Sequence, residues 1–146
     1  MSYKGYFKPR NPSKYMGDPT TIIYRSSWEL KLMRYLDSHS DVIKWASEEF
    51  SIPYVSPIDG KVHRYFPDFL VKKRNIKKTI ETVVIEVKPK IQTTAPTVQK
   101  KANKRYLREV YTWGINSAKW AAAKRYCDHR EWKFVIMTEN ELGIKF

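Results

Sequence analysis

The sequence has a single cysteine, few glycines and no long apolar segment, and each shortage excludes a class of protein. Cys127 alone cannot form a disulfide within the chain or a zinc site built on several thiolates. The 5 glycines are scattered and form no phosphate-binding loop, so we expect no small-molecule cofactor. No apolar run exceeds four residues, which predicts neither a membrane span nor a secretory segment and favours a cytoplasmic protein.

Acidic residues are also scarce. The chain of 146 residues has 28 lysines and arginines against 15 aspartates and glutamates, a formal net charge of +13. Such an excess favours nucleic acid as the partner, because each neutralised phosphate releases bound counterions. Charge alone leaves other possibilities open, since ribosomal, membrane-surface and virion proteins are also basic. The length suits one domain.

The first 21 residues differ in composition from the rest. They combine tyrosines and basic residues with Pro9, Pro12 and Pro19, which interrupt any regular pattern. We interpret residues 1–21 as a basic aromatic arm, either a strap that follows a nucleic-acid backbone or an irregular N-terminus packed on the domain. Residues 22–146 are predicted to form a single domain.

Hydrophobic periodicity predicts an α/β fold with a mixed sheet. A helix is expected over residues 26–38, where Ser26-Ser27-Trp28-Glu29 has the form of a capping box. Strands are expected over residues 42–54, 61–72 and 79–88, with a turn at Asp59-Gly60 between the first two. Helices over residues 98–112 and 117–130 and a strand over 132–138 complete the pattern.

A group of charged residues stands out in this otherwise apolar sheet. Glu86 and Lys88 share one face of the third predicted strand, because side chains alternate with a period of two. Asp68 follows Pro67, which interrupts the preceding strand and allows Asp68 to project beside Glu86. Two carboxylates suit Mg²⁺, for which Mn²⁺ is expected to substitute. Lys88 can orient water and stabilise transition-state charge, so the group predicts metal-assisted phosphodiester hydrolysis.

Pro67-Asp68 together with Glu86-Val87-Lys88 resembles the signature of PD-(D/E)xK nucleases. The resemblance implies a restriction-endonuclease-like core of order α-β-β-β-α-β, a mixed sheet flanked by helices, here with an extra C-terminal helix and the basic N-terminal arm. The segment from Tyr24 to Glu29 resembles the helix-borne acidic motif of junction-resolving and transposon-end members. That likeness implies that Glu29 is a third active-site carboxylate and metal ligand, although a glutamate in a capping box needs no catalytic explanation.

Five motifs spread over nearly the whole chain resemble the T-even-type phage head completion nuclease family. They are Tyr24-Arg25-Ser26, Ile52-Pro53-Tyr54, Arg64-Tyr65-Phe66, Ile85-Glu86-Val87-Lys88-Pro89-Lys90 and Met137-Thr138-Glu139. The resemblance implies an Mg²⁺-dependent endonuclease that cuts DNA during head maturation, before tails join the filled head. It further implies phage head, portal or neck proteins as partners, and location in the host cytoplasm with association to the virion.

Basic residues clustered outside this site are the expected DNA contacts, through phosphates rather than base edges. They are Lys72, Lys73, Arg74, Lys77 and Lys78 between two strands, Lys90 after the third strand, and Lys100, Lys104 and Arg108 on the following helix. Glu48 and Glu49 are left out of the predicted site, because a solvent-facing pair on a strand explains them more simply.

Two rival functions remain open. The first is a non-catalytic DNA-binding component of the phage head or neck that has this fold. The second is a junction-resolving or transposon-end endonuclease, which would share the site and differ in its substrate.

Overall fold

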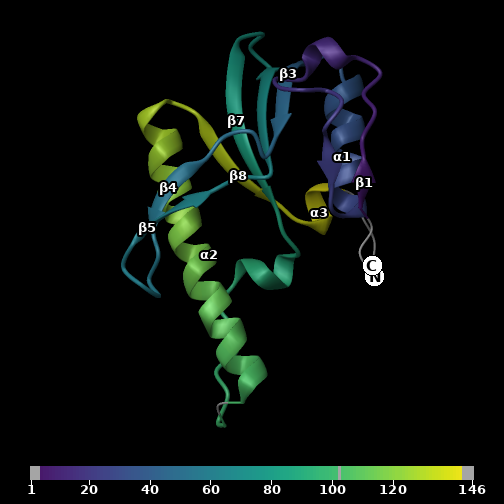
Figure 1. The fold of residues 1–146 in the computed structure, drawn as a ribbon. Helices are drawn as coiled ribbons and strands as arrows, with labels where there is room; N and C mark the ends of the chain where they lie inside the picture. Colours follow the sequence, from purple (N-terminus) through teal and green to yellow (C-terminus); the bar gives the residue numbers. More distant parts are fainter. Residues whose placement is uncertain (1–3, 102, 143–146) are drawn as a thin grey trace.

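A four-stranded mixed sheet forms the centre of the protein (Figure 1). The computed structural model describes residues 4–101 and 103–142. The sheet has the order β3-β6-β7-β8, in which β7 and β8 are parallel and the other pairs are antiparallel. Its strands are β3 (Val42–Ser47), β6 (Phe69–Arg74), β7 (Ile80–Val87) and β8 (Lys133–Met137).

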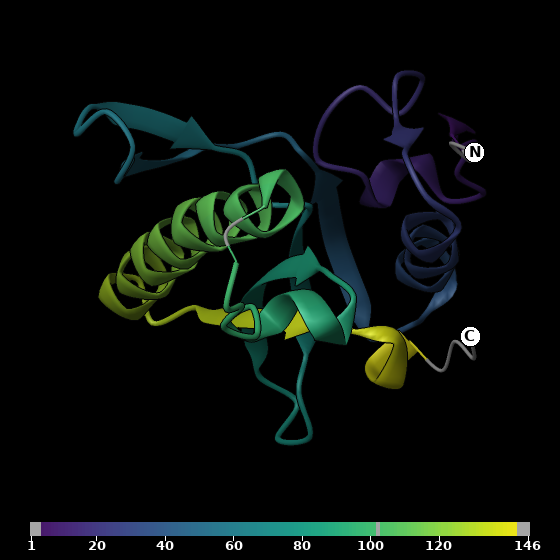
Figure 2. The same cartoon turned by 90° about the horizontal axis from the view of Figure 1, so that it is seen from below.

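Helices cover both faces of this sheet (Figure 2). α1 (Ser27–Ser38) packs on one face, where Met33 and Trp45 are completely buried. α2 (Lys104–His129) covers the other face and buries Trp120 against the sheet. The order α1-β3-β6-β7-α2-β8 confirms the predicted restriction-endonuclease-like core, and a short C-terminal helix, α3 (Glu139–Leu142), follows β8 and contacts α1.

Each of the first two predicted strands is in fact two strands. The predicted strand over residues 42–54 is divided into β3 and β4 (Ile52–Val55), and the one over 61–72 into β5 (Val62–Tyr65) and β6. The first break lies at Glu48, whose φ of 53° is incompatible with a strand, and the second at Pro67, which has no N–H to donate. β4 and β5 form a separate hairpin beside α2, around a turn in which Gly60 has a φ of 68° (Figure 2).

The two helices predicted over residues 98–112 and 117–130 are one continuous helix, α2. It begins only after Asn103, whose side chain accepts a hydrogen bond from the N–H of Tyr106 at 2.8 Å. Gly114 lies in its interior and does not interrupt it, because one glycine costs a helix only about 1 kcal/mol and no proline follows within α2. A short 3-10 helix, η2 (Lys90–Thr93), follows β7. In the described part of the chain, no helix is long and apolar enough to span a membrane.

The N-terminal segment packs on the domain through its aromatic residues. β1 (Gly5–Tyr6) pairs with β2 (Ile23–Tyr24), and a short 3-10 helix, η1 (Pro12–Lys14), lies between them. Phe7 and Tyr15 are buried and meet the ring of Trp45 edge-on, at centroid distances of 5.9 and 4.8 Å. Of the two interpretations of the N-terminal arm, packing on the domain therefore fits residues 4–21. Residues 1–3 of the predicted arm and 143–146 of the predicted domain lie outside the described residues, and the boundary at residue 21 stays a prediction.

Asp37, at the end of α1, ties this segment down. Its buried carboxylate accepts hydrogen bonds from the backbone N–H groups of Arg10 and Asn11, at 2.8 and 3.0 Å. Because Asp37→Ala leaves these donors without their acceptor, we expect it to lower the free energy of unfolding by about 2 kcal/mol in urea denaturation. Asp41→Ala, at an exposed carboxylate nearby, is the matched control. Equal stability of the two variants would contradict the anchoring role.

Candidate active site

Glu29 is held at the start of α1 by the predicted capping box. The hydroxyl of Ser26 accepts a hydrogen bond from the Glu29 N–H at 3.1 Å and donates one to its Oε2 at 3.2 Å. The cap thus orients the carboxylate, which is half-buried. Burial raises the pKa of Glu29, and the negative charge of Glu48 raises it further against the lowering effect of the Ser26 hydrogen bond. The capping and active-site interpretations of Glu29 are therefore compatible.

Asp68 lies where β5 ends and β6 begins, directly after the buried Pro67. Its Oδ2 accepts a hydrogen bond from the N–H of Val87 at 2.8 Å, which links it to the end of β7. Burial raises the pKa of Asp68 to about 8, and the charge of Glu86 acts in the same direction. This electrostatic interaction between Asp68 and Glu86 is consistent with the proximity that the sequence predicts for them.

Glu86 is the most deeply buried acid of the site. Its side chain is on β7 and the residue is only 6% exposed, yet no hydrogen-bond partner for its Oε1 exists among the described residues. The Tyr65 hydroxyl is likewise buried and without a partner among them. Burial raises the pKa of Tyr65, and the charge of Glu86 raises it further, so this phenol stays protonated. A buried carboxylate oxygen without a donor is costly unless a cation or a proton satisfies it.

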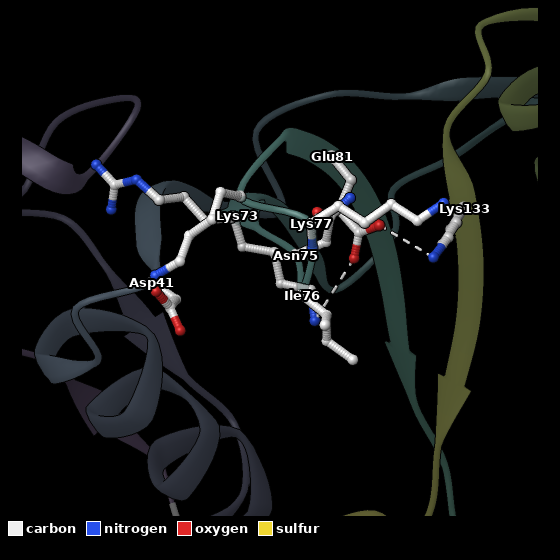
Figure 3. A pocket seen from close by; sticks show the side chains of 9 residues that line it. Asp41, Lys73, Asn75, Ile76, Lys77, Glu81 and Lys133 are labelled. Carbon is white, nitrogen blue, oxygen red and sulfur yellow. Dashed lines mark hydrogen bonds and ion pairs between the residues drawn. The ribbon is translucent and has the colours of Figure 1, made fainter.

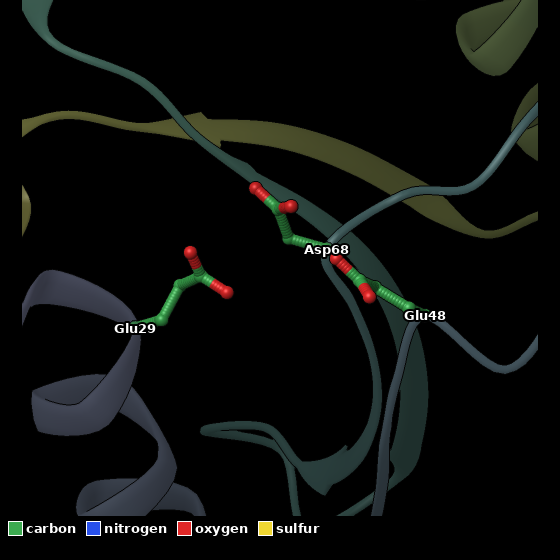
Figure 4. A group of neighbouring side chains, drawn as sticks. All are labelled: Glu29, Glu48 and Asp68. Carbon is green, nitrogen blue, oxygen red and sulfur yellow. The ribbon is translucent and has the colours of Figure 1, made fainter. Parts of the chain in front are cut away.

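Glu48 also belongs to this site, although sequence analysis left it out. Glu29, Glu48 and Asp68 each offer one carboxylate oxygen, and these oxygens lie within 4.8 Å of one another. Figure 4 shows the three side chains converging from α1, the end of β3 and the start of β6. Glu49, by contrast, is exposed and accepts a hydrogen bond from the hydroxyl of Tyr15 at 3.2 Å. Glu48 and Glu49 are therefore not the solvent-facing pair that was expected.

Two comparisons with known proteins show the family of this chain. Residues 39–139 match the model of a family described as the TnsA-like endonuclease N terminal. The chain is also 40% identical to the head completion nuclease of Enterobacteria phage T4, over 97% of this chain and 95% of the relative. The chain belongs to the TnsA-like endonuclease family. The matched residues include Glu48, Asp68, Glu86 and Lys88, whereas Glu29 precedes them.

Lys88 of this TnsA-like endonuclease follows β7 directly. Its backbone N–H donates to the carbonyl oxygen of Met137 at 3.0 Å, which extends the pairing with β8 by one residue. The residue is half-buried and forms no ion pair with any described residue. Lys88 is therefore held two residues beyond Glu86, with an ammonium group that has no ion-pair partner in the described part of the chain.

The basic residues between β6 and β7 lie far from the carboxylates. Lys72, Lys73 and Arg74 belong to β6 itself, and Lys77 and Lys78 to the turn that follows, rather than all to one loop as predicted. Asp68 immediately precedes the other end of β6, so at about 3.3 Å per residue the strand places Asp68 about 13 Å from Lys72 and about 20 Å from Arg74. This end of the sheet forms a pocket of about 610 Å³, in which Glu81 pairs with Lys73 at 3.7 Å and Lys133 at 3.0 Å (Figure 3).

The other predicted DNA contacts follow the end of β7 that carries Glu86. Lys90 begins η2, immediately after the end of β7, and its N–H donates to Glu139 at 2.7 Å. Lys100 precedes α2, and Lys104 and Arg108 are exposed on its first turns. Figure 1 places η2 and this half of α2 at the opposite end of the molecule from the turn between β6 and β7.

Proposed function

We propose that this endonuclease is a metal-dependent enzyme that hydrolyses phosphodiester bonds of packaged viral DNA during phage head completion, before heads and tails join. The observation that carries the proposal is a set of four acids: Glu29, Glu48 and Asp68 converge, and Glu86 interacts with Asp68. The buried Glu86 has an oxygen without a partner among the described residues. The printed name of the T4 relative supports the role in head completion. Head, portal or neck proteins in the host cell, and the virion, are the expected context.

The donor set suits a small, hard divalent cation. Carboxylate oxygens are the ligands that Mg²⁺ prefers in proteins, and Mn²⁺ accepts the same ligands. Asp68 and Glu86, with Glu29, would hold the ion, which when bound lowers the pKa of water and stabilises charge on the phosphate. Burial is the main cause of the raised pKa values of Asp68 and Glu29, and a bound cation would act against it. No zinc-type ligand set is involved, since these donors are all oxygen.

The residues around the ion have distinct parts in the proposed reaction. The Val87 N–H fixes one oxygen of Asp68 and so orients the other. The Lys88 ammonium orients the attacking water and stabilises the negative charge that develops on the phosphate. Basic residues hold the DNA backbone without reading bases, because phosphate contacts position a duplex but carry no sequence information.

A nuclease assay on the full chain tests the proposed function. Linear duplex DNA should be cut in Mg²⁺ or Mn²⁺ and remain intact in EDTA, because without a cation the acids repel the phosphate. Flapped and four-way substrates belong in the same experiment. A strong preference for four-way DNA would favour junction resolution instead, and a preference for transposon ends would favour that rival. DNA binding without cleavage in either cation would favour the non-catalytic head or neck component.

The two basic groups should contribute unequally to binding of the DNA that is cut. Lys104→Ala with Arg108→Ala should weaken affinity and lower the slope of log affinity against log salt by about 2, one unit for each lost phosphate contact. Lys77→Ala with Lys78→Ala is the matched control at the far end of the sheet, and its slope should stay within about 1 of the wild type. Fluorescence anisotropy at several salt concentrations measures both. Equal losses would mean that DNA spans the whole sheet.

A further inference from the structure

Arg25 lies at the edge of the four acids and pairs with Glu48. Its Nε donates to Oε1 at 3.2 Å and its Nη2 to Oε2 at 3.1 Å, so both oxygens of Glu48 are engaged. Arg25 immediately precedes the cap of α1, and its charge also interacts with Glu29 and Asp68. A guanidinium group therefore supplies positive charge to a cluster of carboxylates.

The backbone holds Glu48 in place for this contact. Its N–H donates to the carbonyl oxygen of Asp68 at 3.2 Å, one residue beyond the last paired residues of β3 and β6. Its φ of 53° lies in the left-handed region, where residues other than glycine are uncommon and often functional. This conformation ends β3 and turns the carboxylate of Glu48 toward Glu29 and Asp68 (Figure 4).

The contact between Arg25 and Glu48 is easily exchanged. The two side chains are 54% and 31% exposed, and exposed ion pairs contribute little to stability because water screens them. Glu86, which interacts with Asp68, differs, since it is 6% exposed and its Oε1 has no partner among the described residues. The cluster thus combines an exchangeable cation at its rim with an unsatisfied oxygen at its base.

We propose that Glu48 is a further metal ligand of this endonuclease and that Arg25 occupies it until the cation binds. Glu48 then releases the guanidinium, which turns to a phosphate of the DNA backbone. A guanidinium suits both positions, because its planar fork pairs with carboxylate and phosphate in the same two-point manner. Arg25 would therefore link the filling of the metal site to the grip on DNA. The inference rests on the proposed function.

Titration of the free protein with Mn²⁺ tests the first half. Glu48→Gln keeps the shape of the side chain and should weaken Mn²⁺ binding at least about 10-fold, judging by the loss of a charged metal ligand. Arg25→Ala removes the competing cation and should tighten Mn²⁺ binding about 3-fold or more, on the same electrostatic reasoning. Glu49→Gln is the matched control, one residue away and outside the cluster. Isothermal calorimetry measures all four proteins.

Two results of that titration would overturn the inference. One is Mn²⁺ affinity of Glu48→Gln equal to that of Glu49→Gln. The other is an Arg25→Ala variant that loses Mn²⁺ affinity as Glu48→Gln does, which would make Arg25 only a support for Glu48. Thermal melting of each variant without metal establishes that it is folded, and a folded Glu48→Asp variant provides a second test of the ligand if Glu48→Gln is not.

DNA binding tests the second half. Addition of Ca²⁺ should strengthen binding of a short duplex by the wild type, because Arg25 is released to the phosphate. The gain should be smaller in Arg25→Ala, where the cation only neutralises the acids, and partly restored in Arg25→Lys, which keeps the charge without the fork. A full gain in Arg25→Ala would overturn this step. A wild type that neither binds Mn²⁺ nor cuts DNA would instead refute the proposed function. If the wild type does both and Glu48→Gln binds Mn²⁺ as tightly as the wild type, this inference alone is refuted.

Discussion

Replacing Glu86 with glutamine should lower the rate of DNA cleavage at least about 10²-fold, the usual cost of removing one group that stabilises a transition state. The residue is buried on β7 next to Asp68, so its carboxylate cannot be replaced by water from outside. Glutamine has nearly the same volume and should not disturb the packing. DNA binding should survive, because Glu86 carries negative charge and makes no favourable contact with phosphate by itself.

Lys88→Ala should cause a loss of similar size through a different step. The ammonium group acts on the water and on the developing charge, so the loss should appear in the rate at saturating DNA rather than in affinity. Glu81→Gln, on the same strand but at the other end of it, is the matched control for both variants. Single-turnover cleavage and anisotropy measured in parallel separate the two effects. Undiminished cleavage by both Glu86→Gln and Lys88→Ala would refute the site assignment.

The order of the core elements was predictable because its local signals are strong. Ser26 and Glu29 form the capping box that the sequence pattern indicates, and Pro67 lies in the break between β5 and β6 that it predicts. The run Val83 to Ile85 is completely buried in β7, as its β-branched residues indicate. These features depend on neighbours in the sequence, and tertiary contacts do not overrule them.

Glu48 was missed because its role depends on strand register. Ile52 pairs with Tyr65 and Ser47 with Phe69, so the hairpin around Asp59-Gly60 continues into β3 and β6 with a shift of one residue. If the pairing of β4 with β5 is extended, Glu49 lies opposite Asp68, whereas the pairing of β3 with β6 places Glu48 there. The left-handed backbone of Glu48 causes this shift and decides between the two residues. The turn at Asp59-Gly60 therefore indicated which residues lie near Asp68. The left-handed position itself was not predictable, because it is occupied by Glu48 rather than by a glycine.

The placement of the basic residues could not be obtained from sequence alone. Lys77 and Lys78 are close to Glu86 along the chain, yet β7 carries the chain away from the turn by its full length. Lys104 is more distant from Glu86 in sequence, but it follows η2, which begins shortly after the end of β7 that carries Glu86. Proximity in sequence misleads in a sheet, because a strand separates its two ends by about 3.3 Å per residue.

The stability of the metal-free enzyme should fall as the pH rises from about 5 to about 8, through the proton on Asp68. The pKa of Asp68 is raised from 3.8 to about 8 in the folded protein, by burial first and by Glu86 second. Below pH 4 both the folded and the unfolded state bind this proton, so the full stability is present. Between the pKa values of 3.8 and about 8, the unfolded state has lost the proton and the folded state retains it. The free energy of unfolding therefore falls by up to about 1.4 kcal/mol for each unit that the pH rises.

Asp68→Asn removes this titration and isolates its effect. The difference in unfolding free energy between Asp68→Asn and the wild type should grow with pH in EDTA, because only the wild type loses the stability that the Asp68 proton provides. From pKa values of 3.8 and about 8, we expect a rise of roughly 3–4 kcal/mol in favour of the variant between pH 5 and 8 in urea denaturation. Mg²⁺ should reverse the trend for the wild type only, since a bound cation stabilises the folded state and replaces the proton. Asp41→Asn, at an exposed carboxylate, is the control, and a difference between Asp68→Asn and the wild type that stays constant with pH would show that Asp68 is ionised in the folded protein without metal.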